Sequence, residues 1–306
     1  MTPLTEEYKA SIENNHLKEL LLRRENLPVL EEVLVTESNE VARLNALKER
    51  KQLDFGAPIS PEELDEVAAT VYDEVNTFLD VKPKDSPACI YPSLFTLPEK
   101  DLRNIILALY GVAFPLLEVP AIATLDIPCA IAGLAALGVG AIVQTALKQP
   151  RYIPRLQKIV LKKRPITELL PTIGHEYAHH IHHSLAGLSC QNYDIFKEGH
   201  ARGVERYIAN FQAVKDNNEV FLLEISDWTV GELKSAYLWL CRTQKIQPTK
   251  SLLQPKSCRD LEEMLSRFYE KQPTPHAIGN ALFLIYEAQY GRDIYRQAIH
   301  GEFQFR

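Results

Sequence analysis

Through the first part of the chain, apolar residues recur three and four positions apart, as they do along the buried face of an amphipathic helix. This spacing predicts helices over about residues 5–24 and 28–51. A third helix is expected to begin at Ser60-Pro61-Glu62-Glu63, where a capping serine precedes a proline and two acids, and to run to about Leu79. Residues 1–100 are therefore expected to form a helical N-terminal region.

The middle of the chain contains two apolar stretches, residues 105–125 and 127–147. Each has about the 20 residues that a helix needs to cross a bilayer. Basic residues flank the pair at both ends, as expected for a hairpin that enters and leaves a membrane on the cytoplasmic side. Glu118 within the first stretch favours a helical hairpin buried in a protein core instead, since a carboxylate at membrane depth is costly. Residues 101–147 are thus interpreted as an apolar hairpin, with the membrane and the core as alternatives.

After residue 80 the apolar spacing departs from that of a helix in two short segments. Residues 88–91 form a possible short strand, and residues 156–162 alternate between apolar and polar positions, which predicts a second strand. The lysines along the second strand are typical of the edge of a sheet. From Thr167 onward the spacing is helical, with helices expected at about 168–186, 195–213, 229–243, 258–270 and 276–298. The predicted fold class is α+β and mainly helical, with a small sheet and a third domain over residues 148–306.

Composition and charge exclude several classes of protein. The chain has 306 residues and a net charge of −6, so its overall charge does not indicate a nucleic-acid partner. Its five cysteines are scattered and form no C-x-x-C pair, which argues against a disulfide framework and against a cysteine zinc site. The polar N-terminus predicts no secretory signal peptide. A cytoplasmic location is expected, with membrane contact through residues 105–164 if the hairpin enters a bilayer.

The segment His175-Glu176-Tyr177-Ala178-His179 fits the pattern H-E-x-x-H. Residues four apart lie on one face of a helix, so His175 and His179 can bind one zinc ion while Glu176 serves as general base. Zinc held by neutral nitrogens lowers the pKa of bound water to near neutrality. The alternative is a histidine-rich surface helix, but apolar neighbours such as Leu169, Leu170 and Ile173 indicate a partly buried one.

A catalytic zinc ion needs a third protein ligand, and Glu198 is the candidate. It follows His179 after eighteen residues and is followed by the small residues Gly199, Ala201 and Gly203, which are expected to let its helix press closely against the helix of His175 and His179. The alternative is an ordinary acid in the first turn of a helix capped by Asp194. Arg202 and Glu205 lie one and two turns further on, where they can orient the ligand carboxylate or pair with each other. His180, His182, His183 and His200 are interpreted as residues that support the ligands or lie at the surface.

H-E-x-x-H, eighteen residues and then Glu198-Gly199-His200-Ala201 resembles the signature of the gluzincin clan of zinc peptidases, most closely its aminopeptidases. The resemblance covers roughly residues 150–210 and implies a small sheet beside the active-site helix. It also implies a downstream oxyanion donor, for which His276 is the best candidate, ahead of Tyr193, Tyr207 and Tyr286. The chain lacks the G-x-M-E-N motif with which the aminopeptidases recognise a free amine, so exopeptidase activity is not expected.

The sequence therefore predicts a zinc peptidase that acts on a peptide or protein substrate. Its expected metal ligands are His175, His179 and Glu198, with Glu176 and His276 as catalytic residues. Two alternatives come from other classes: an inactive zinc-binding module that holds a peptide, and a helical scaffold at a membrane surface.

Overall fold

The computed structural model describes residues 4–50, 55–91, 150–254, 266 and 272–306. The chain divides into two compact units, Met1–Pro87 with Arg164–Arg306, and Ala88–Lys163. The predicted hairpin at residues 101–147 lies outside the described residues, as do the domain boundaries at its two ends and nearly all of the predicted helix at 258–270. Among the described helices, none combines the length and the apolar character needed to cross a membrane. The fold is α+β and mainly helical, as the sequence predicts.

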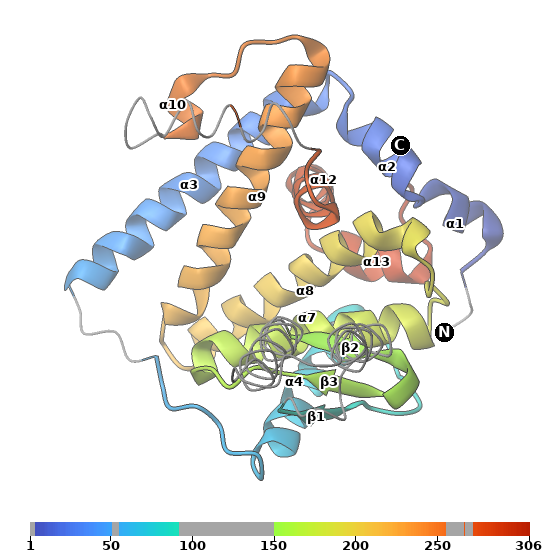
Figure 1. Cartoon of the computed structure of the whole chain (residues 1–306), viewed down its shortest axis with the longest axis vertical. Helices are drawn as coiled ribbons and strands as arrows, with labels where there is room; N and C mark the ends of the chain where they lie inside the picture. The colour runs from blue at the N-terminus through green and yellow to red at the C-terminus, as the bar shows by residue number, and fades with distance from the viewer. Residues whose placement is uncertain (1–3, 51–54, 92–149, 255–265, 267–271) are drawn as a thin grey trace, which may run out of the picture. The chain divides into compact units, whose positions relative to one another are not determined.

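The described helices of the first unit come from both ends of the chain (Figure 1). They are α1 (Glu6–Ser11), α2 (Asn14–Leu21), α3 (Asn26–Arg50), α4 (Leu64–Leu79), α7 (Ile166–Ser184), α8 (Asp194–Lys215), α9 (Val220–Gln244), α10 (Lys250–Leu253), α12 (Pro275–Tyr290) and α13 (Ile294–His300). α3 packs along α9 and also contacts α12, so helices far apart in the sequence share one core.

Four predicted helices differ from the observed ones in their bounds or number. The helix predicted over 229–243 is α9, which begins nine residues earlier, at Val220. The predicted helix over 5–24 is two helices, with Ile12 and Glu13 between them. The predicted helix over 276–298 is also two, because Gly291 stops α12 with a φ of 81°, a conformation that a non-glycine residue rarely adopts. Ser60 and Glu63 exchange the expected capping hydrogen bonds, but α4 itself begins at Leu64.

The second unit contains a three-stranded mixed sheet in the order β1-β3-β2. β1 (Ala88–Ile90) pairs with β3 (Lys158–Val160) in parallel, and β2 (Arg151–Ile153) pairs with β3 in antiparallel fashion after the short 3-10 helix η2 (Pro154–Leu156). β3 is therefore the central strand, and the prediction of an edge strand is wrong. Ile159 is fully buried and pairs with Cys89 on one side and Tyr152 on the other. The lysines lie before and after this buried residue, and their charge does not indicate whether the strand has one neighbour in the sheet or two.

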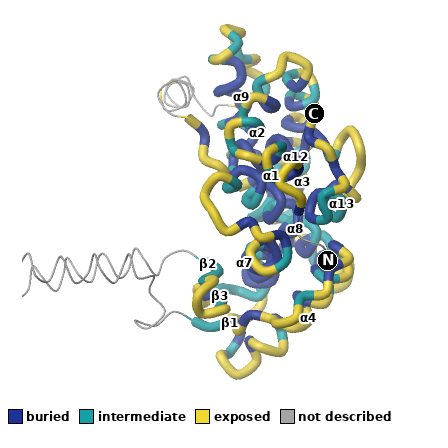
Figure 2. The backbone as a smooth tube through the Cα atoms, turned by 90° about the vertical axis from the view of Figure 1, so that its right-hand side faces the viewer, coloured by how far each residue is buried: buried dark blue, intermediate teal, exposed yellow. Residues whose placement is uncertain are grey.

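The core of the first unit is built around α7 and α8. α8 packs against α7 on one side and α12 on another, and the tube of Figure 2 is largely buried along these helices. α4 covers a further face of α7, where the rings of Tyr72 and Tyr177 stack with their centroids 4.0 Å apart. Tyr177 is fully buried and its hydroxyl donates a hydrogen bond to Asn76 Oδ1 at 3.0 Å. The face of α7 opposite His175 and His179 is thereby packed into the core.

This packing predicts a graded loss of stability at Tyr177. Tyr177→Phe removes one hydroxyl and should lower the free energy of unfolding by about 1 kcal/mol, whereas Tyr177→Ala also leaves a cavity and should cost about 3–5 kcal/mol. Denaturant unfolding measures both. Tyr290→Ala is the control, since that side chain is 64% exposed. Equal losses in the Phe and Ala variants would contradict the buried stack.

Candidate metal centre

His175 and His179 lie one turn apart on α7, and their Nε2 atoms are 3.2 Å from each other. Glu198, in the first turns of α8, directs Oε2 at both, at 3.4 Å from His175 Nε2 and 3.4 Å from His179 Nε2. The three atoms thus form a nearly equilateral triangle between the two helices. The side chains are largely buried, with exposed fractions of 9%, 19% and 20% for His175, His179 and Glu198.

Glu198 Oε2 is an unusual atom, because it is buried and has no hydrogen-bond partner among the described residues. Imidazole nitrogens surround it, yet none is oriented as a donor toward it. Burial raises the pKa of Glu198, but the positive field of His179 and the close approach of the other imidazoles lower it well below its usual range. A buried carboxylate needs positive charge beside it, which a protonated imidazole or a metal ion held by this cluster can supply.

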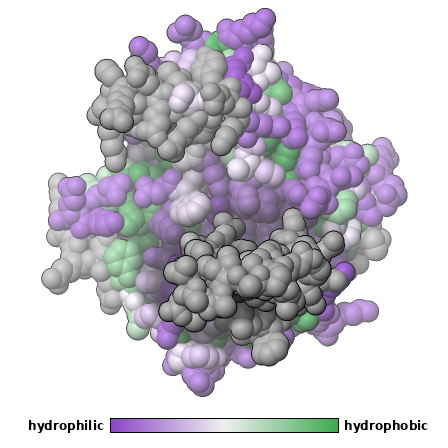
Figure 3. Space-filling model, viewed as in Figure 1, coloured by the Kyte–Doolittle hydropathy of each residue, from purple (hydrophilic) through white to green (hydrophobic). Residues whose placement is uncertain are grey.

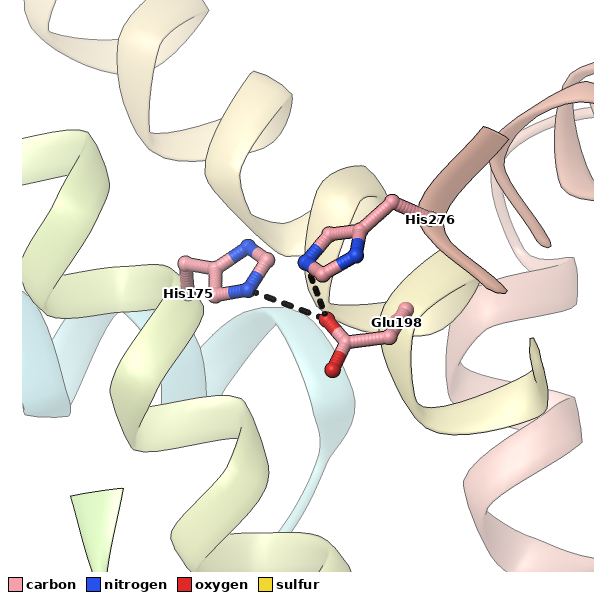
Figure 4. Close-up of side chains that lie close together, drawn as sticks. All are labelled: His175, Glu198 and His276. Atoms are coloured by element: carbon pink, nitrogen blue, oxygen red, sulfur yellow. Dashed lines mark ion pairs between the residues drawn. The ribbon is translucent and has the colours of Figure 1, made fainter. Parts of the chain in front are cut away.

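His276 completes the cluster from a third helix (Figure 4). It lies in the first turn of α12, and its Nε2 is 2.9 Å from Glu198 Oε2. His175, Glu198 and His276 form a group whose ligand atoms all lie within 4.8 Å of one another, so these residues can hold a metal ion. The rings of His175 and His276 are nearly parallel, at 6°.

Two glycines allow α12 to bring His276 this close to Glu198. Gly199 follows Glu198 directly, and a Cβ atom there would lie 2.5 Å from the backbone carbonyl of Gly279. A Cβ atom at Gly279 would overlap the backbone carbonyl of Ile195 on α8. α8 and α12 therefore cross in backbone contact, one residue after Glu198 and three after His276. The sequence predicts that the small residues after Glu198 let its helix approach the helix of His175 and His179, and this is wrong for the partner: Gly199 faces α12, and Gly203 faces the ring of Tyr295.

Glu205 supports the cluster from behind His175. Its Oε2 is 3.1 Å from His175 Nδ1, the nitrogen that faces away from Glu198. Burial raises the pKa of Glu205, but Arg202 and His175 lower it further, to about 2. Burial lowers the pKa of His175, while Glu198 and Glu205 raise it more strongly, to about 10. An ionised carboxylate on Nδ1 fixes the ring orientation and makes Nε2 a better metal ligand.

Glu205 is also the start of a chain of polar contacts that reaches α12. Arg202 donates to Glu205 at 2.6 Å and to Glu232 on α9 at 2.7 Å. The second carboxylate oxygen of Glu232 accepts from Asn280 Nδ2 at 2.8 Å. Asn280 lies one turn after His276 on α12, so α8 and α12 are joined by polar contacts through α9 as well as by the glycine contact.

The predicted general base and the other histidines of the motif region differ in burial. Glu176 is buried, with an exposed fraction of 7%. His180, His182 and His200 are buried, and His182 Nε2 lies 3.0 Å from His200 Nδ1, a contact that joins α7 to α8. His183 is the exposed member of that set.

The tyrosines that the sequence offers as rivals of His276 are engaged elsewhere. Tyr207 stacks on Phe78 with ring centroids 3.9 Å apart, and the Tyr286 hydroxyl donates to the backbone carbonyl of Arg306. Tyr193 lies in the 3-10 helix η3 (Gln191–Tyr193), ahead of α8. Of the four candidates, His276 is the one with a contact to Glu198.

Two supporting residues, Glu232 and Asn280, have no signal in the sequence. They come from α9 and α12, and nothing in their local spacing relates them to the motif. Glu205 does have such a signal, because positions 198, 202 and 205 are four and seven residues apart and share one face of α8. Figure 3 shows that hydrophilic residues gather in the middle of the face that it draws.

Comparison with known proteins gives no relative for this chain: no family model, no curated protein and no solved structure matches it. The argument for function therefore depends on the chemistry and geometry of the cluster.

The glycine contact predicts a sharp difference between two otherwise similar substitutions. Gly279→Ala forces α8 and α12 apart and should lower the free energy of unfolding by about 1–3 kcal/mol or more. Gly231→Ala on α9 is the matched control: a Cβ there meets no atom within 4 Å, so it should stabilise by about 0.5–1 kcal/mol through helix propensity. Chemical denaturation of both variants provides the measurement. A Gly279→Ala protein as stable as wild type would contradict the backbone contact.

Proposed function

We propose that the protein is a zinc-dependent peptidase, with His175, His179 and Glu198 as metal ligands and Glu176 as general base. The observation that carries the proposal is the triangle of ligand atoms, with sides of 3.2, 3.4 and 3.4 Å. Zinc bonds of 2.0–2.1 Å in a tetrahedral site place ligand atoms about 3.3–3.4 Å apart. The three side chains thus have the separation that one zinc ion requires, and the ion would satisfy the unpartnered Glu198 Oε2.

The donor set also suits this metal chemically. Two imidazoles and one carboxylate form the ligand set of many catalytic zinc sites, and Glu205 provides the carboxylate behind a ligand histidine that such sites usually have. When bound, zinc polarises a substrate carbonyl and lowers the pKa of water. Glu176 directly follows His175 on α7, so it leaves the helix beside the ligand face. It would accept the proton of the attacking water and then pass it to the leaving amine.

The resemblance to the gluzincin clan supports the same assignment. The clan's signature needs H-E-x-x-H on one helix and the glutamate on a second helix packed closely against it. α7 and α8 carry these residues and pack against each other, with Gly174 of α7 close to the side chains of Val204 and Ile208 on α8. We propose internal peptide bonds as the substrate, because the amine-recognition motif of the aminopeptidases is missing from the sequence.

The metal assignment predicts close to one equivalent of zinc per chain. His175→Ala, His179→Ala and Glu198→Ala should each lose most of it, because each removes one of three ligands. Metal analysis of the purified proteins after dialysis is the measurement. His183→Ala, an exposed histidine on the same helix, serves as control and should keep its zinc. Full zinc content in Glu198→Ala would show that the third ligand is another residue.

The general-base assignment predicts a separation of binding from catalysis. Glu176→Gln should bind zinc and fold as the wild type does but lose hydrolysis by at least about a hundredfold, since an amide cannot accept the proton. Glu168→Gln, in the first turn of α7, is the control and should stay active. Cleavage of unstructured protein substrates is the assay. Zinc binding without any wild-type hydrolysis would favour an inactive peptide-binding module instead.

A further inference from the structure

The contact between His276 and Glu198 is short but is not a hydrogen bond. Its Nε2 is 2.9 Å from Glu198 Oε2, the distance of a good hydrogen bond, but the contact lacks hydrogen-bond geometry and leaves that oxygen without a donor. A histidine whose purpose is to hold Glu198 in place would donate to it directly. A short contact without hydrogen-bond geometry is what two ligands of one metal ion would show.

The distances indicate where that partner would lie. Glu198 Oε2 is 3.4, 3.4 and 2.9 Å from the Nε2 atoms of His175, His179 and His276. With bonds of 2.0–2.1 Å, separations from 2.9 to 3.4 Å correspond to ligand–metal–ligand angles of about 90–110°. One ligand atom each from His175, Glu198 and His276 lies within 4.8 Å of the others, so a shift of about 1 Å brings the three atoms within the span of one coordination sphere.

We infer that His276 is an exchangeable fourth protein ligand of the metal, which closes the site at rest and leaves it when substrate binds. This inference depends on the proposed zinc site and adds a means of regulating it. At rest three imidazoles and one carboxylate fill a four-coordinate site, the arrangement of structural zinc sites rather than of open catalytic ones. The reaction then requires His276 to give up its position.

Exposure identifies His276 as the ligand that leaves. Its side chain is 40% exposed, against 9%, 19% and 20% for His175, His179 and Glu198. The backbone of α12 is held by Gly279 against α8, so the exchange is a rotation of the His276 side chain and not a movement of the helix. After rotation the imidazole remains beside the cluster, where it can donate to the oxyanion of the substrate, as the clan resemblance implies.

The test uses the full chain loaded with Co²⁺, whose visible absorption reports the number and type of ligands. His276→Ala should change the spectrum of the Co²⁺ protein and weaken Co²⁺ binding by at least about tenfold, because one of four ligands is lost. His276→Gln should behave in the same way, which excludes an effect of side-chain volume. His183→Ala is the matched control and should keep both the wild-type spectrum and the wild-type affinity.

The outcomes separate this inference from the proposed function. A His276→Ala protein with the wild-type spectrum, and with affinity within about twofold, would show that His276 is not a ligand while leaving the zinc site intact. A wild-type protein that binds neither Co²⁺ nor Zn²⁺ would overturn both. Activity at saturating zinc adds a further measurement: the oxyanion role predicts a kcat about a hundredfold lower in His276→Ala even when the metal is fully bound.

Discussion

A carboxylate that is taken out of water must be paired, and Glu198 is the place in this protein where that requirement is most demanding. Its Oε2 is buried among three imidazole nitrogens and has no hydrogen-bond donor among the described residues. Glu205, the second buried carboxylate of α8, is paired with Arg202 and His175. The packing of α7, α8 and α12 keeps these groups from water, so their charge has to be balanced inside the cluster. A metal ion held by this cluster would provide that balance, and Glu205 lies where it would orient His175 as a ligand.

The cluster depends on backbones that approach closely, and glycine makes that approach possible. Gly199 and Gly279 let α8 and α12 touch without side chains between them, which puts Glu198 and His276 within reach of each other. The polar chain through Arg202, Glu232 and Asn280 joins the same helices by directed contacts. Apolar packing sets the distance between helices, and these contacts set their rotation. Both kinds of contact are needed to keep the side-chain atoms of the cluster within a few tenths of an ångström of the separation that a metal ion would require.

The elements of the fold were predictable where local signals are strong. α3, α4, α7 and α8 follow from apolar spacing, and their bounds agree with the predicted ones to within a few residues. The break at Ile12–Glu13 and the stop at Gly291 were not predicted, because apolar spacing continues across both. The position of β3 in the middle of its sheet was predicted wrongly. Strand order depends on partners from distant segments, Ala88–Ile90 and Arg151–Ile153, and a strand's own residues do not identify them.

For the cluster, the sequence by itself determined which side chains share a face of one helix. The four-residue spacing of His175 and His179 puts both on one face, and the spacing of 198, 202 and 205 does the same on α8, because the pitch of an α-helix is constant. Only the tertiary structure decided which faces meet. It brings Glu198 to the two histidines, sets Glu205 behind His175, and carries His276 to Glu198 from a segment distant in the chain. Crossing points between helices depend on packing summed over many residues, and no short stretch of sequence contains that sum.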